Sequence, residues 1–75
     1  MSKLPNSRFR IVARPSHGGF ITDFFFLVDG EVRHSCYGEG RKDDREIRNF
    51  AKGYTGGQDV PIEDVPASWT SRKAA

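Results

Sequence analysis

The chain has 75 residues, a formal net charge of +2, a pI near 9.0 and one cysteine. A chain of this length forms one small domain that buries only about 60% of its unfolded surface. One cysteine excludes an intrachain disulfide, and with no signal-peptide pattern and no apolar run near the roughly 20 residues of a membrane span, we expect a soluble cytoplasmic protein without membrane contact.

The basic residues concentrate in the first part of the chain. Residues 1–54 hold ten Lys/Arg against seven Asp/Glu, whereas residues 55–75 hold two against three. The organisation is expected to change at the same point. We predict a single β-β-β-α domain with a short N-terminal arm over residues 1–54, and an extended proline-containing tail over residues 55–75.

The first predicted strand follows the polar arm of residues 1–7. Residues 8–14 read RFRIVAR, in which apolar side chains alternate with arginine, as in a half-buried strand. Pro15 is expected to end this strand. The glycine-rich stretch that follows it, to Gly19, is expected to form a loop.

Two further strands are predicted within residues 20–37, joined by Asp29-Gly30. An Asp-Gly pair between apolar runs favours a type I′ hairpin turn, which needs positive φ at both residues. Counting outward from the turn places Leu27 opposite Val32 and Phe25 opposite His34.

The first strand is expected to pair antiparallel with the second, with Arg14 opposite Phe20 and Phe9 opposite Phe25. The three strands then agree on one apolar face for a helix. That face is expected to carry Phe9, Ile11, Ala13, Ile21, Phe25, Leu27, Val32 and Cys36.

A helix is predicted after the Gly38-Glu39-Gly40 break. Asp43 is its expected N-cap, with Glu46 three residues later, and Gly53 its expected stop. Its apolar stripe is Ile47, Phe50, Ala51 and Tyr54. The predicted fold class is therefore α+β, with a three-stranded antiparallel sheet, one helix on one face and an extended C-terminal tail.

The face of the sheet away from the helix is expected to mix arginine with aromatic side chains. Aromatic rings can stack on bases while arginines contact phosphates, and both residue types also anchor protein interfaces. This face is expected to include Arg8, Arg10, Val12, Arg14, Thr22, Phe24, Phe26, Val28, Arg33, Ser35 and Tyr37. The candidate binding residues among them are Arg8, Arg10, Arg14, Phe24, Phe26, Arg33 and Tyr37.

The alternative is that this face is covered. The tail offers Val60, Ile62, Val65 and Trp69 as apolar cover. Asp59, Glu63 and Asp64 could pair with the arginines, each of which needs a partner if buried. A homodimer through the sheet face would also cover it.

The helix is expected to carry a second basic surface. Its members are Arg41, Arg45, Arg48 and Lys52. This stripe could follow a phosphate backbone or an acidic protein. The alternative is an ordinary solvated helix face, with Asp43, Asp44 and Glu46 lowering the positive potential.

Catalytic chemistry is not expected. His34 and Cys36 face the helix in this register with Asp23 across from Cys36, and a Cys–His–Asp set can form a nucleophilic centre. However, Cα atoms two residues apart on a strand are separated by about 6.5 Å, and buried cysteine is usually a small hydrophobe. His17, His34 and one cysteine lack paired metal-ligand spacing. We expect no enzyme activity, metal, cofactor or small-molecule substrate.

Two binding functions stay open, with nucleic acid or a host protein as partner. The first is a nucleic-acid-binding regulator using the Arg/Phe/Tyr face. The order of three strands and a helix resembles phage integrase arm-binding and plant AP2-type domains, a resemblance that implies a sheet in the DNA major groove. The second is an inhibitor or adaptor of the size of phage-encoded anti-CRISPR proteins, which would block a host protein's acidic or nucleic-acid-binding surface.

Overall fold

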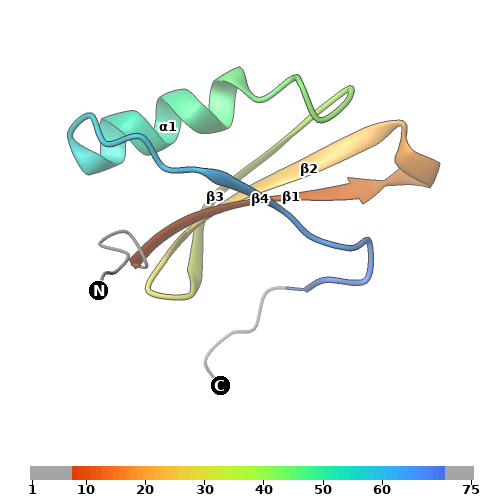
Figure 1. Cartoon of the computed structure of the whole chain (residues 1–75), viewed down its shortest axis with the longest axis horizontal. Coiled ribbons are helices and arrows are strands. Elements are labelled where there is room, and N and C mark those ends of the chain that lie inside the picture. Colours follow the sequence, from red (N-terminus) through yellow and green to blue (C-terminus); the bar gives the residue numbers. More distant parts are fainter. Residues whose placement is uncertain (1–7, 71–75) are drawn as a thin grey trace.

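In the computed structural model, which describes residues 8–70, a four-stranded sheet carries one helix across one face (Figure 1). The strands lie in the order β3-β2-β1-β4. The elements are β1 (Phe9–Ser16), the short 3-10 helix η2 (His17–Gly19), β2 (Ile21–Val28), β3 (Glu31–Gly38), α1 (Arg45–Thr55) and β4 (Ile62–Asp64). The α+β class is confirmed, but the sheet is mixed and has four strands rather than three antiparallel ones.

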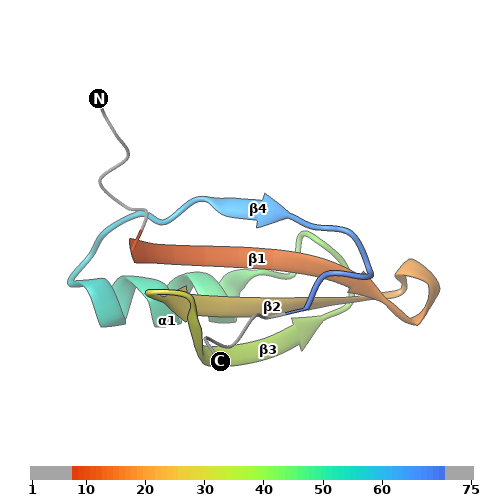
Figure 2. The same cartoon turned by 90° about the horizontal axis from the view of Figure 1, so that it is seen from below.

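The fourth strand comes from the segment expected to be an extended C-terminal tail. β4 pairs parallel with residues 11–13 of β1, and the Val65 N–H donates to the Ala13 carbonyl over 3.0 Å. Pro61 and Pro66 flank this short strand, because proline has no N–H to give to a ladder. Figure 2 shows β4 beside β1, with the following segment crossing β1 and β2 on the face away from α1.

The turn between β1 and β2 decides which side of β2 faces the helix. β1 continues to Ser16, and the chain reverses over residues 17–20, three of which have positive φ. Arg14 therefore lies opposite Asp23 and not opposite Phe20 as expected. An offset of three residues is odd, and side chains alternate along a strand, so the two sides of β2 are exchanged relative to the prediction.

Pro15 lies within β1 and does not end it. It is opposite Thr22 in the ladder with β2. Because β4 pairs only with residues 11–13, β1 is an edge strand at Pro15, where proline is tolerated.

The Asp29-Gly30 turn is confirmed, and a β-bulge follows it. Asp29 and Gly30 have φ of 53° and 85°. Leu27 lies opposite Val32 as predicted, but the register then shifts and Phe26 pairs with His34. Arg33 is the extra residue of the bulge, and the rest of β3 is shifted by one residue relative to β2.

These two shifts put Phe24 and Phe26 into the core, so their predicted place on the second face is wrong. Both are 0% exposed, and Phe26 lies 5.7 Å from Phe50 and 5.3 Å from Tyr54 between ring centroids. Phe25 lies on the opposite face instead, over which Trp69 packs. The buried cluster between sheet and helix contains Ile11, Ala13, Phe24, Phe26, Val28, Ile47, Ala51 and Val60.

The helix presents its predicted apolar stripe to the sheet, but both of its ends differ from the prediction. Asp44 is the N-cap residue, whereas the Asp43 carboxylate accepts a hydrogen bond from the Glu39 N–H over 3.2 Å. Gly53 lies inside the helix, which ends at Thr55 and is followed by Gly56 as a left-handed C-cap. Among the described residues, no helix is long and apolar enough to cross a membrane.

Candidate functional site

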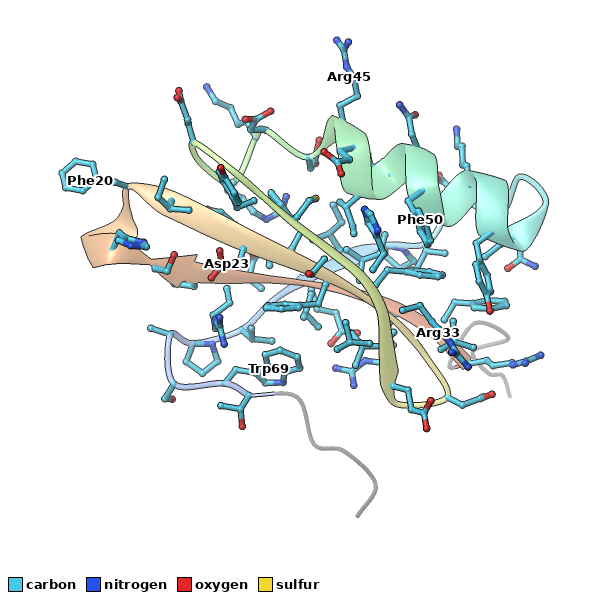
Figure 3. All side chains as sticks on the ribbon, turned by 180° about the vertical axis from the view of Figure 1, so that it is seen from behind. Phe20, Asp23, Arg33, Arg45, Phe50 and Trp69 are labelled. Atoms are coloured by element: carbon cyan, nitrogen blue, oxygen red, sulfur yellow. The ribbon has the colours of Figure 1, made fainter. Side chains whose placement is uncertain are left out.

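The second face of the sheet is covered in part by the C-terminal segment. The Trp69 ring packs on Phe25 with 5.4 Å between centroids, and Figure 3 shows Trp69 on the side of the sheet away from α1. Arg14 joins this contact, since its guanidinium donates to the Trp69 carbonyl over 3.0 Å and lies 5.0 Å from the Phe25 ring. This arrangement corresponds to the covered alternative at Arg14 and Phe25, whereas Tyr37 on β3 stays 74% exposed.

The arginines of the predicted binding face are held by acidic side chains of the same chain. Arg10 donates two hydrogen bonds to Glu63, over 2.9 and 2.8 Å, which raises the pKa of Arg10 and lowers that of Glu63. Arg14 pairs with Asp23 over 3.0 Å. The other two pairs are Arg8–Asp29 at 3.3 Å and Arg33–Glu31 at 3.8 Å.

The charge balance of the described part differs from that of the whole chain. Three of the twelve basic residues, Lys3, Arg72 and Lys73, lie outside residues 8–70, whereas all ten acidic residues lie within this range. The described part therefore holds nine basic residues against ten acidic ones. The basic excess of residues 1–54 is offset by Glu63 and Asp64 of β4 and by Asp59, which lies beside the helix.

The predicted basic stripe of the helix is divided. Arg41 precedes the helix and bonds Asp64 of β4, so it serves as a link between the two segments. Arg48 pairs with Asp44 over 3.0 Å. Arg45 points away from the sheet in Figure 3. One surface pocket on this side is lined by Asp44, Arg45, Arg48, Asn49, Lys52 and Asp59.

The longer of the two outer strands of the sheet is β3, with eight residues against three in β4. No strand within residues 8–70 pairs with the outer edge of β3, and Tyr37 near the end of this strand is 74% exposed. A pocket wraps around the edge, because its lining comes from both faces of the sheet and from α1. The lining residues are Asp23, Phe25, Ser35, Cys36, Tyr37 and Glu46.

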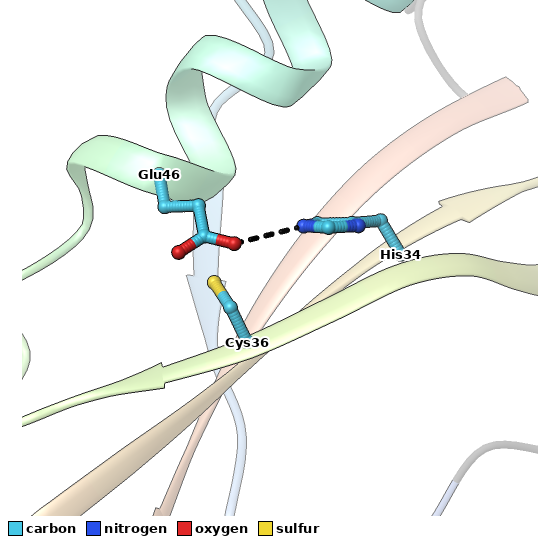
Figure 4. Close-up of side chains that lie close together, drawn as sticks. All are labelled: His34, Cys36 and Glu46. Carbon is cyan, nitrogen blue, oxygen red and sulfur yellow. Dashed lines mark hydrogen bonds and ion pairs between the residues drawn. The ribbon is translucent and has the colours of Figure 1, made fainter.

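A His–Cys–Glu cluster lies where β3 meets the first turn of α1 (Figure 4). His34 and Cys36 face the helix as predicted, and the His34 Nε2 lies 3.2 Å from a carboxylate oxygen of Glu46. The His34 ring stacks on Phe50 at 4.1 Å between centroids. Burial, helped by the negative charges of Glu46 and Asp43, raises the pKa of the Cys36 thiol to about 11.

The cluster differs from the Cys–His–Asp set considered from the sequence. Asp23 lies opposite Tyr37 and not opposite Cys36, and its carboxylate pairs with Arg14 on the other face of the sheet. Glu46 takes the acidic position instead. The position of Glu46 beside His34 could not be predicted from the sequence, because it depends on how the helix crosses β3. The only sequence signal was that Glu46 falls in the first turn of the predicted helix.

A scan against protein-family models, a search of curated proteins and a search of solved structures each returned no match.

Proposed function

We propose that this chain is a non-enzymatic module that binds another protein through the outer edge of β3. The single observation that carries this proposal is the asymmetry of the sheet. The chain's own β4 lies along part of β1, whereas β3, which is eight residues long, pairs with β2 on its inner edge and with no strand of residues 8–70 on its outer edge. An open strand edge offers N–H and C=O groups that a partner strand can pair with.

The pocket around this edge supports a selective contact. When a partner strand adds to a sheet, main-chain hydrogen bonds provide affinity and pockets for alternate side chains provide specificity. Tyr37 and Ser35 line one side of the edge, and Cys36 and Glu46 line the other. Because the Glu46 side chain is 68% exposed, it favours a basic residue in the added segment.

The bulge at Arg33 limits where a partner strand can pair. A bulge disrupts the regular spacing of main-chain groups and twists the edge away from a straight partner. The regular part of β3 is residues 34–38, which pair with β2 without interruption. We therefore place the proposed contact on this stretch.

The internal ion pairs argue for a protein partner over nucleic acid at the sheet. Affinity for nucleic acid depends on cationic groups that neutralise phosphates. Arg8, Arg10, Arg14 and Arg33 are each paired with a carboxylate of the chain. Phe24 and Phe26, proposed to stack on bases, are buried.

Nucleic acid binding by α1 is a second candidate. Arg45 and Lys52 share one surface with Asn49 and have no ion pair within residues 8–70. Arg45 also projects outward (Figure 3). This surface could contact phosphates, although Asp44 and Asp59 border it.

The test selects random peptides, longer than β3, for binding to the full chain and compares variants of two exposed aromatic residues. Tyr37→Lys should weaken the selected peptides by about tenfold or more, because it alters the pocket at the edge. Phe20→Lys is the matched control, since Phe20 is an aromatic residue that is 79% exposed and lies outside the pocket at the edge. Equal binding by Tyr37→Lys and the wild-type chain would refute the edge proposal.

Two further measurements separate the alternatives. Light scattering reports whether a second copy pairs along β3, in which case Tyr37→Lys would shift a dimer to a monomer. Titration with short DNA duplexes and single-stranded RNA at low salt tests the helix. Binding that falls steeply with salt and is lost in Arg45→Glu and Lys52→Glu would favour the second candidate instead.

A further inference from the structure

We propose that His34, Cys36 and Glu46 form a binding site for a divalent metal ion of the zinc class. One ligand atom from each residue, the imidazole nitrogen, the thiol sulfur and a carboxylate oxygen, lies within 4.8 Å of the other two. These are the three types of protein ligand that zinc uses. The proposal is separate from peptide binding at the edge of β3 and does not depend on it.

The positions of the three residues follow from the fold. The bulge in β3 turns His34 and Cys36 toward the helix, opposite Phe26 and Phe24. Side chains two residues apart on a strand point to the same side. Glu46 approaches from the first turn of α1, so the site would join two elements (Figure 4).

The nitrogen–oxygen distance fits a tetrahedral ion, and the sulfur lies within 4.8 Å of both atoms. Bond lengths of about 2.0–2.1 Å to nitrogen and 2.0–2.2 Å to oxygen place two tetrahedral ligand atoms about 3.4 Å apart. The His34 Nε2 and the Glu46 oxygen are 3.2 Å apart. With a zinc–sulfur bond of about 2.3 Å, the sulfur would lie about 3.6 Å from the nitrogen, so a shift of about 1 Å in one side chain would complete the set.

The surroundings hold the ligands in place. Stacking on Phe50, with only 5° between the ring planes, fixes the orientation of the His34 imidazole. A metal site needs this kind of outer support to orient its ligands. The negative charges of Glu46 and Asp43 near the thiol also favour a cation at this position.

The site would retain an open coordination position. The chain contributes three ligands, and zinc is usually four-coordinate. Cys36 and Glu46 also line the pocket along the outer edge of β3, so the fourth position would face solvent there. Water or a donor group from a bound molecule could occupy it.

The test is titration of the full chain with Co²⁺ and with Zn²⁺ alone, under reducing conditions. We expect one ion per chain, a thiolate-to-cobalt charge-transfer band and a melting temperature that rises with Zn²⁺ concentration. The variants Cys36→Ser, His34→Gln and Glu46→Gln should each bind at least about tenfold more weakly. His17→Gln is the matched control, because His17 lies in the β1–β2 turn and should bind as the wild type does.

Two results would overturn the metal site. One is the absence of the charge-transfer band at millimolar Co²⁺. The other is undiminished binding by Cys36→Ser or Glu46→Gln, which would place the ion elsewhere on the chain. Because the Glu46 side chain is 68% exposed, Glu46→Gln should not unfold the chain, and a loss of binding in this variant reports on the ligand itself. Circular dichroism of each variant shows whether it is folded.

Discussion

Trp69 packs against Phe25 on the sheet face opposite the helix, with 5.4 Å between ring centroids. From the sequence, this face could be either covered by the C-terminal segment or exposed for binding. The Trp69 contact shows that the segment covers the face at Phe25. The main-chain pairing of β4 with β1 holds the same segment. The sheet is therefore enclosed by α1 on one side and in part by the Trp69 segment on the other.

Replacing Trp69 by alanine should lower the free energy of unfolding by about 2 kcal/mol. The change removes a partly buried aromatic contact and exposes Phe25. Phe20→Ala is the control, because Phe20 is 79% exposed, and it should change stability by less than about 0.5 kcal/mol. Urea denaturation of both variants measures the difference; equal values would mean that Trp69 does not cover the sheet.

A matched pair of substitutions tests the register of β2. Phe24→Leu should cost about 1–2 kcal/mol of unfolding free energy, because Phe24 is fully buried between sheet and helix. Phe25→Leu should cost less than half as much, since Phe25 is only partly buried on the other face. Thermal melts of the two variants give the comparison. A larger loss of unfolding free energy for Phe25→Leu than for Phe24→Leu would support the register predicted from the sequence instead.

The Arg10–Glu63 pair should contribute to stability only above acidic pH. The hydrogen bonds from Arg10 lower the pKa of Glu63 below the ordinary 4.5. The Glu63 carboxylate therefore takes up a proton less readily in the folded chain than in the unfolded chain. The contribution is present above pH 4.5 and is lost as pH falls through the lowered value. Because both side chains are nearly half exposed, we expect only about 0.5 kcal/mol.

Melting curves of Glu63→Gln at several pH values measure this contribution. The variant should be less stable than the wild type near pH 7, and the difference should shrink at acidic pH. Glu39→Gln, at an exposed glutamate, provides the control. A difference that stays constant with pH would assign the loss to packing and not to the ion pair.

The Cys36 thiol should react slowly with alkylating reagents. Its pKa is raised from 9.0 to about 11, and the thiolate is the reactive form. At pH 8 the folded chain should therefore react about a hundredfold more slowly than the unfolded chain. The raised pKa also means that the thiol's contribution to stability, present below pH 9.0, is lost as pH rises toward about 11. Iodoacetamide kinetics at pH 8, in buffer and in urea, measure the alkylation rates of the folded and the unfolded chain. Similar rates would contradict the predicted protection of the thiol.

The sequence was sufficient for features that depend on neighbouring residues. The Asp29-Gly30 turn needs only local backbone geometry, and the stripe of Ile47, Phe50 and Ala51 shows helical spacing. Both predictions are confirmed. Counting residue pairs outward from this turn, however, could not reveal the bulge at Arg33, because β2 has apolar residues on both faces and fits either register.

Features that depend on distant parts of the chain were missed. Pro15 indicated a strand end, but the short β4 leaves that part of β1 at an edge, where proline is tolerated. β4 itself is three residues long and has no alternation to recognise. The predicted placing of Phe24 and Phe26 beside the arginines depended on the wrong register for β2. The pairing of Arg10 was missed because its partner Glu63 comes from the segment that we treated as a tail.

The central claim, that β3 is the binding edge, is tested most directly by amide hydrogen exchange with and without a selected peptide. Pairing with a partner strand should slow the exchange of amides within residues 34–38, leaving those on the outer face of α1 unchanged. Protection confined to α1, with no change along β3, would contradict the claim.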